Sequence, residues 1–326
     1  MTIVFDEVEG WGEDTWESDV TGVAVDSRDR VYALRRGGGD LVTVLEPDGT
    51  VADRWGHACL SERPHLLSID REDTIHIADD GGHQVHVFDL RGRLLDTIGS
   101  GTPSDTGFDV TAPPGTEAAY DSIRGGPPFN RPTKAVASPS GELFVSDGYR
   151  NCRVHRFSAD HELARSWGGP GADPGCFVVP HSLTLDAEGR VLVCDRENDR
   201  IQVFSRDGEL LDVWNDVQRP TDIAFDTDGR LYVAELARGP RDLASWRLGR
   251  AEEELPGQVR VWDRDRTVVA RIGPPTVEFL APHAVAVDSV GALYVSEVPD
   301  SFANFTGRPH RKHRCLHKFV PRTPHS

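Results

Sequence analysis

The sequence is poor in basic residues. It has 36 Lys and Arg against 53 Asp and Glu in 326 residues, so its formal net charge is −17 with neutral histidines. A net charge of this size repels polyphosphates and anionic lipids. We therefore expect neither nucleic-acid binding nor binding to a membrane surface.

Long apolar runs and paired cysteines are also missing. No apolar run approaches the roughly 18 residues that span a bilayer, and the first residues, MTIVFDEVEGW, have acids where a signal peptide has a basic stretch. The five cysteines are scattered without a Cys-x-x-Cys pair, which indicates neither a disulfide framework nor a zinc ribbon. These absences predict a cytoplasmic protein that does not insert into membranes.

Turns and internal repeats are what the chain has in abundance. Its 32 glycines and 22 prolines favour an all-β protein over a helical bundle. A pattern of two short apolar runs around a polar turn, which predicts a β-hairpin, occurs six times. The six copies begin at Thr21, Pro64, Pro132, Pro180, Pro220 and Pro282.

Each hairpin is followed by two further strand patterns. A third apolar run has the form HQVHVFDL or RIQVFS, and a fourth ends in a signature such as DRWG or RSWG. Six copies of four strands predict a single-domain, six-bladed β-propeller over residues 1–326. The sixth copy lacks its fourth strand, but residues 2–12 end in a similar signature, EGWG, so we expect them to form the outer strand of the last blade.

The residues that open the inner strands define a ring, because equivalent positions in a propeller surround its central axis. In blade order we take this ring as Gly22, His65, Thr133, His181, Thr221 and His283. Three histidines on alternate blades converge on the axis and would leave an open fourth position on a metal. Zinc suits this ligand set, and other divalent transition metals also bind imidazole. The alternative is that the histidines only follow proline in a repeat and hydrogen-bond the backbone.

A second ring lies fourteen residues later, at the end of the second strand of each copy. We take it as Arg36, Asp79, Asp147, Asp195, Glu235 and Glu297. Its single arginine indicates either a local need for a cation or an ion pair with a neighbouring blade. Tyr149 and Arg196 come shortly after this ring, and the strand directions place them on the face of the disc that carries the histidines.

The other histidines are expected to have structural roles. His86, His155 and His317 occupy one place in the third strand, which we interpret as a polar surface position. His83 falls outside the inner ring, so we expect it to bond loop backbone rather than a metal.

Three extra segments lengthen the connections of the repeat. They cover residues 101–128, 237–257 and 299–313, and all are expected to open on the histidine face. Long loops gathered around one mouth usually cover a ligand site.

The repeats resemble NHL repeats, and one set of segments resembles the catalytic core of peptidyl-α-hydroxyglycine α-amidating lyases. These segments include PHLLSID, FNRPTKAVASPSGELFVSDGYRNCRVHRFS, VPHSLTLDAEGRVLVCDRENDRIQVFS and APHAVAVD. The resemblance implies zinc on His65, His181 and His283, a catalytic tyrosine at Tyr149, and active-site arginines at Arg36 and Arg196. In animal lyases an aspartate that helps to hold a structural calcium follows the third zinc histidine, and here that position is Ala284.

The leading functional hypothesis is a metal-dependent lyase that cleaves the C–N bond of a small-molecule or peptide-derived α-hydroxyglycine. Tyr149 is the candidate base, Arg36 the contact for the substrate carboxylate and Arg196 the residue that tunes Tyr149. One alternative is a hydrolase or lactonase that uses water on the same metal. A second alternative is a non-catalytic NHL interaction module.

Overall fold

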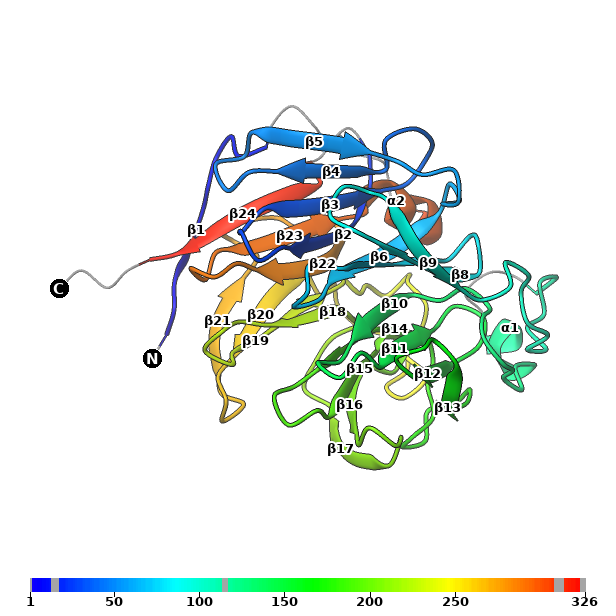
Figure 1. Cartoon of the computed structure of the whole chain (residues 1–326). Coiled ribbons are helices and arrows are strands. Elements are labelled where there is room, and N and C mark those ends of the chain that lie inside the picture. Colours follow the sequence, from blue (N-terminus) through cyan, green and yellow to red (C-terminus); the bar gives the residue numbers. More distant parts are fainter. Residues whose placement is uncertain (1, 13–17, 113–116, 308–313, 323–326) are drawn as a thin grey trace.

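A computed structural model describes residues 2–12, 18–112, 117–307 and 314–322 of the chain. These residues form six four-stranded antiparallel sheets, which are the blades of a β-propeller (Figure 1). Each inner strand contacts the inner strands of the two neighbouring blades. The predicted fold class is confirmed.

The strands of each blade follow one another in sequence from the axis outward, and their bounds are as follows. Blade one contains β2 (Val20–Val25), β3 (Val31–Arg35), β4 (Val42–Leu45) and β5 (Val51–Trp55). Blade two contains β6 (Pro64–Ile69), β7 (Ile75–Asp79), β8 (Gln84–Phe88) and β9 (Leu94–Ile98). Blade three contains β10 (Lys134–Ala137), β11 (Leu143–Asp147), β12 (Arg153–Phe157) and β13 (Leu163–Gly168). Blade four contains β14 (Pro180–Leu185), β15 (Val191–Asp195), β16 (Arg200–Phe204) and β17 (Leu210–Trp214). Blade five contains β18 (Pro220–Phe225), β19 (Leu231–Glu235), β20 (Gln258–Trp262) and β21 (Val268–Ile272).

Blade six joins the two ends of the chain. Its inner strands are β22 (Pro282–Val287), β23 (Leu293–Glu297) and β24 (Leu316–Pro321), and its outer strand is β1 (Phe5–Glu7) from the N-terminal segment. Phe5 pairs with Pro321 in this antiparallel register, and both ends of the chain lie on one side of the molecule (Figure 1). The ring is closed as the signature in residues 2–12 predicted.

Helices are short and lie in the connections. Among the described residues they are α1 (Glu117–Asp121), α2 (Pro299–Thr306) and one 3-10 turn at Arg196–Asn198. None of the helices in the described ranges is long and apolar enough to cross a membrane.

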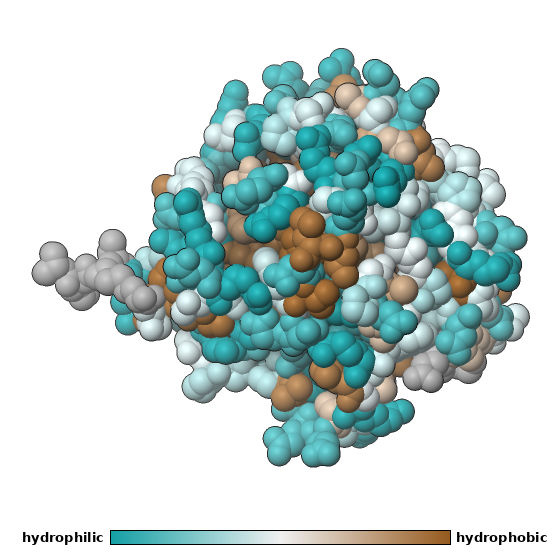
Figure 2. Space-filling view, turned by 90° about the horizontal axis from the view of Figure 1, so that it is seen from below, coloured by the Kyte–Doolittle hydropathy of each residue, from teal (hydrophilic) through white to brown (hydrophobic). Residues whose placement is uncertain are grey.

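Burial falls from the axis to the rim of each blade. The second strand β7 is buried along its whole length, whereas four of the five residues of β5 are exposed. The exposed outer strands carry polar and charged residues such as Asp53 and Arg54, which protects free sheet edges from pairing with other chains. Figure 2 shows a largely hydrophilic face with one group of apolar residues near its middle.

Three tryptophans, in or just after an outer strand, pack on the next blade, which explains the tryptophan of the recurring signature. Each indole lies against a glycine in the turn between the third and fourth strands of that blade. A Cβ there would lie 2.5–2.8 Å from an indole carbon, and the positive φ of the turn also favours glycine. The pairs are Trp11 with Gly49, Trp55 with Gly92 and Trp167 with Gly208.

In blade one, the predicted members of both rings are wrong by one residue. Val20 pairs with Arg35, as Pro64 pairs with Asp79 in blade two. The ring member of blade one is therefore Thr21 rather than Gly22, and the second ring contains Arg35 rather than Arg36. The inner ring alternates threonine and histidine without exception.

The five carboxylates of the second ring, called the acidic ring below, have a structural role. Each carboxylate accepts a backbone N–H from the loop that leads into the inner strand of its own blade, which fixes where that strand begins. The five donors are the N–H groups of Ser61 to Asp79, Asn130 to Asp147, Val178 to Asp195, Gln218 to Glu235 and Ala281 to Glu297, at 2.7–3.1 Å.

The third-strand histidines are buried, so their assignment to the surface is wrong. His86, His155 and His317 are 1%, 0% and 3% exposed. Each faces the carboxylate of its blade, with Nε2 to oxygen distances of 3.7 Å to Asp79, 3.3 Å to Asp147 and 2.9 Å to Glu297. The repeat places them opposite the ring carboxylates because β8, β12 and β24 pair with the strands that end in those acids.

Candidate metal centre and active site

Three histidines meet at the propeller axis. His65, His181 and His283 are each the second residue of an inner strand, in β6, β14 and β22. Their ring centroids are 4.6, 4.8 and 4.9 Å apart, and they offer ligand atoms that all lie within 4.8 Å of one another. The structure thus brings together the alternate-blade histidines that the sequence pattern singled out.

Backbone carbonyls hold the three rings in one orientation. Each Nδ1 lies 2.6–2.7 Å from the carbonyl oxygen of a threonine on the following blade, and a carbonyl oxygen only accepts hydrogen bonds. The proton of each neutral ring is therefore on Nδ1, and the lone pair is on Nε2. The pairs are His65 with Thr133, His181 with Thr221, and His283 with Thr21.

The histidines are neutral at physiological pH because burial disfavours their charged form. Burial is the largest cause that lowers the pKa of His65 and His181 well below the ordinary value, and it lowers the pKa of His283 to about 3. The positive charges of Arg36 and Arg196 act in the same direction. Three neutral imidazoles with unprotonated Nε2 atoms are the donor set that a divalent transition metal binds.

Tyr149 reaches this centre from blade three. It lies in the turn after β11, and its hydroxyl is 3.0 Å from Nε2 of His65 and 3.2 Å from Nε2 of His181. A Cβ at Gly148 would collide with the carbonyl oxygen of Pro180, so glycine lets this turn approach blade four. The phenol oxygen therefore lies directly beside the candidate metal ligands.

Arg196 and a buried carboxylate support the tyrosine. The Arg196 guanidinium carbon lies 5.6 Å from the centroid of the Tyr149 ring, and its Nε donates to Glu197 at 2.8 Å. Burial alone would lower the pKa of Arg196, but Glu197 and Tyr149 hold it above the ordinary value. Arg196 is therefore a fixed positive charge beside the phenol.

Glu197 belongs to a buried network that the sequence analysis missed. Arg219 donates to its Oε1 at 2.9 Å, and Arg238 lies 3.6 Å from its Oε2. Burial would raise the pKa of Glu197, but Arg219, Arg196 and Arg238 hold it at about 2. Glu197 is thus ionised and anchors Arg196. The only available signal was an acid directly after Arg196, since Arg219 and Arg238 lie in blade five.

Arg36 reaches the histidines from blade one, where it directly follows β3. It is half-buried and donates from Nη1 to the hydroxyl of Ser301 in α2 at 2.6 Å. Its positive charge contributes to the low pKa of His65 and His283. The described part of segment 299–313 therefore positions this arginine, and residues 308–313 lie outside the described residues.

The other two extra segments supply aromatic side chains around Tyr149. Phe108 and Tyr120 come from segment 101–128, and Trp246 comes from segment 237–257. The ring of Tyr120 lies 5.8 Å from each of the other two, centroid to centroid. Tyr120 belongs to a buried apolar cluster, and Phe108, Trp246 and Tyr149 pack against that cluster. These loops form an apolar wall beside the phenol.

His83 lies apart from the histidine cluster. Its Nδ1 accepts the backbone N–H of Arg131 at 3.2 Å, so it does bond loop backbone. In the described part of the chain, His65, His181 and His283 are the one group of His, Cys, Asp or Glu side chains spaced for a metal ion.

Comparisons with known proteins agree with this architecture. The NHL repeat family model matches residues 177–204, which cover β14 to β16. NHL repeat-containing protein 3 of Mus musculus is 30% identical over 293 residues, which are 85% of this chain and 76% of that protein. A streptogramin B lyase structure matches with a TM-score of 0.59 over 99% of both chains at 12% identity, which shows the shared fold.

One relative has a named activity. Peptidyl-alpha-hydroxyglycine alpha-amidating lyase 1 of Drosophila melanogaster is 30% identical over 332 residues. The match covers 94% of this chain and 53% of that protein, so the chain spans about half the length of this relative.

Proposed function

Because this chain belongs to the NHL-repeat family of β-propellers and is similar to amidating lyases over almost its whole length, we propose that it is a metal-dependent C–N lyase. The substrate is an N-acyl-α-hydroxyglycine. Its C–N bond breaks, the hydroxyl carbon becomes the aldehyde carbon of glyoxylate, and the nitrogen leaves as a primary amide. One proton moves from the hydroxyl to the nitrogen, and no water is consumed.

The contact between Tyr149 and the histidine cluster carries this proposal. A phenol oxygen at 3.0 and 3.2 Å from two Nε2 atoms would lie within reach of the hydroxyl of a substrate held beside those atoms. A structural tyrosine would pack its ring and hydrogen-bond a loop. Here the hydroxyl instead points at the donor atoms of the candidate ligands.

The three histidines fit a divalent transition ion such as zinc. Their Nε2 atoms are unprotonated, their Nδ1 protons are held by carbonyls, and burial keeps them neutral. A divalent ion bound there supplies positive charge that lowers the pKa of a nearby hydroxyl group.

Tyr149 is proposed to move the proton. A phenol has an ordinary pKa of about 10, so it needs nearby positive charge to act as a base. Arg196 supplies that charge in a fixed position because Glu197 holds its Nε. After taking the hydroxyl proton, Tyr149 can return it to the departing nitrogen.

Arg36 is proposed to hold the substrate carboxylate. Its Nη1 is oriented by Ser301, and no carboxylate in the described residues forms an ion pair with it. A guanidinium can bind a carboxylate through two parallel hydrogen bonds. The carboxylate would then be fixed next to the carbon whose C–N bond breaks.

A product assay with N-benzoyl-α-hydroxyglycine tests the proposal. Zinc-loaded protein should release benzamide and glyoxylate in equal amounts, and protein treated with a chelator should lose this activity until zinc is restored. His181→Ala should be inactive, whereas His83→Ala, a histidine variant outside the cluster, should keep its activity. Absence of turnover by the zinc-loaded protein would reject the lyase.

The same assay separates the two alternatives. A hydrolase or lactonase would leave the hydroxyglycine intact and cleave esters or lactones with incorporation of labelled water. A non-catalytic module would act on neither class of substrate, whether or not the protein binds zinc.

A further inference from the structure

Three arginines lie at the mouth of the site, beyond the groups used in the reaction. Arg63 comes two residues before His65, Arg131 two residues before Thr133, and Arg150 directly after Tyr149. Because His65, Thr133 and Tyr149 belong to the axial centre, these arginines lie one step outward on the same face.

Two of the three arginines share one carboxylate. Asp80 is buried, and it pairs with Arg63 at 3.0 Å and with Arg131 at 3.3 Å. In the part of the chain that the structure describes, no carboxylate pairs with Arg150, which lies instead over the ring of Phe108 at 5.0 Å. The cluster therefore has a net charge of about +2 in a chain whose overall charge is −17.

Arg150 lies where its charge is unfavourable. Burial is the largest cause that lowers its pKa, and Arg131 and Arg63 lower it further, with Asp80 opposing them. A further anion beside Arg150 would relieve this repulsion.

The cluster is accessible from solvent. The side chain of Arg63 is 49% exposed and that of Arg131 is 25% exposed. Arg63 is also close enough to Tyr149 for their charges to interact, which places the cluster beside the phenol. An anion bound here would therefore be part of the same ligand that reaches Tyr149.

We infer that the acyl part of the substrate carries its own anionic group, and that Arg63, Arg131 and Arg150 bind it. This inference rests on the proposed lyase activity and specifies its substrate as a dianion. One carboxylate belongs to the hydroxyglycine and meets Arg36, and the second belongs to the amide that is released. Guanidinium groups suit this task because each can donate two parallel hydrogen bonds to a carboxylate.

A matched pair of substrates tests the inference. N-glutaryl-α-hydroxyglycine carries a terminal carboxylate, and its terminal methyl ester has the same carbon chain without that charge but with one more methyl group. We expect kcat/KM to be about 10- to 100-fold higher for the acid, the range for a hydrogen bond to a charged group. The preference should decrease at high salt.

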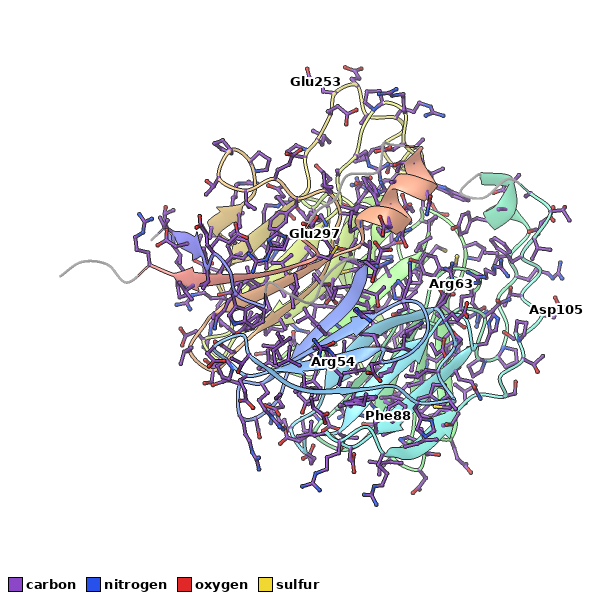
Figure 3. The ribbon with its side chains drawn as sticks, turned by 90° about the horizontal axis from the view of Figure 1, so that it is seen from above. Arg54, Arg63, Phe88, Asp105, Glu253 and Glu297 are labelled. Atoms are coloured by element: carbon purple, nitrogen blue, oxygen red, sulfur yellow. The ribbon has the colours of Figure 1, made fainter. Side chains whose placement is uncertain are left out.

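Arg150→Gln is the main variant because it breaks no ion pair and so leaves the fold intact. It should reduce the preference for the acid at least several-fold while leaving kcat/KM for the ester unchanged. Arg63→Gln should have a similar effect. Arg54→Gln is the control, because Arg54 lies on the exposed outer strand β5, away from Arg63 (Figure 3), and it should keep the full preference.

Binding measurements separate this inference from the proposed lyase. N-glutarylglycine and its terminal methyl ester lack the reactive hydroxyl and can be titrated calorimetrically. Tighter binding of the acid, lost in Arg150→Gln, supports the arginine site even if no hydroxyglycine is cleaved, and the lyase alone then fails. Equal cleavage and equal binding of acid and ester overturn the inference and leave the lyase standing. Failure of both glycine compounds to bind also overturns it.

Discussion

Blades two, four and six differ from blades one, three and five in one side chain at the axis. The even blades carry histidine at the second position of the inner strand, and the odd blades carry threonine at the same backbone position. The even blades supply the candidate metal ligands. The odd blades supply the carbonyl oxygens that receive the histidine Nδ1 protons.

The two kinds of blade form one circle of hydrogen bonds. Each threonine hydroxyl donates to the carbonyl of the proline before the next histidine, and each histidine donates to the carbonyl of the next threonine. The threonine bonds run from Thr21 to Pro64, from Thr133 to Pro180 and from Thr221 to Pro282, at 3.4, 2.9 and 3.0 Å. Blades with a histidine ligand thus alternate with blades whose threonine orients that ligand. Tyr149, from blade three, contacts the histidines of the two neighbouring blades.

Removing an even-blade histidine should have the largest effect. His181→Ala deletes one of three ligands, so we expect zinc content to fall from about one ion per chain to near zero, with loss of turnover. Elemental analysis of wild type, His181→Ala and His83→Ala measures this. Equal zinc occupancy in wild type and His181→Ala would place the metal elsewhere.

Removing the bridging hydroxyl should affect catalysis but not metal binding. Tyr149→Phe keeps the ring and its packing, so zinc content and the thermal midpoint should hardly change. Turnover should fall by about 10²–10⁴, the usual range for general acid–base catalysis. Full activity in zinc-loaded Tyr149→Phe would exclude the tyrosine as base and favour the hydrolase alternative.

Blade six differs from the other even blades because its third strand also holds the N-terminal strand. His317 contacts Glu297 at 2.9 Å and Glu7 of β1 at 2.8 Å. Burial opposes its charge, but the two carboxylates raise its pKa from 6.5 to about 9. Its contribution to stability is therefore complete below pH 6.5 and is lost as the pH rises through 9.

Denaturant unfolding of wild type and His317→Gln at several pH values tests this contribution. The wild type should be more stable by about 3 kcal/mol near pH 6, and this difference should shrink as the pH approaches 10. Parallel stability curves for the two proteins between pH 6 and 10 would contradict a raised pKa for His317.

Removing an odd-blade hydroxyl should have the smallest effect. Thr221→Val loses the bonds to Pro282 and Ala234 but keeps the carbonyl that orients His181. We expect a loss of about 1 kcal/mol in unfolding free energy and zinc affinity within about 10-fold of wild type. A competition titration with a zinc chelator measures the affinity. If Thr221→Val lost zinc as completely as His181→Ala, the threonines of the odd blades would do more than orient the histidine ligands.

The repeat pattern predicted the fold, the closure by the N-terminal segment and the position of all three histidines. It failed by one residue in blade one, because Val20 replaces the proline that marks the start of the other inner strands.

The sequence contains a better marker of the ring position. An Asp or Ser lies five residues after every ring member, as Asp26 does after Thr21, and its carboxylate or hydroxyl bonds the hairpin turn in every blade.

The repeat pattern could not predict ion pairs between residues of different blades. Glu197 follows Arg196 in sequence, but its other partners, Arg219 and Arg238, come from the next blade. His86 looked solvated because a histidine between two apolar residues of a strand faces away from them. In a propeller that second face is covered too, by the acidic ring and the neighbouring blade.

The sequence by itself determined the number of blades, their strand order and which residue types reach the axis, because a repeat carries its backbone geometry with it. Only the tertiary structure decided which nitrogen of each histidine faces the centre, that Tyr149 contacts two of the rings and that Arg63 and Arg131 share Asp80. Those facts depend on side chains from different blades, and distances between blades are set by packing around the whole ring.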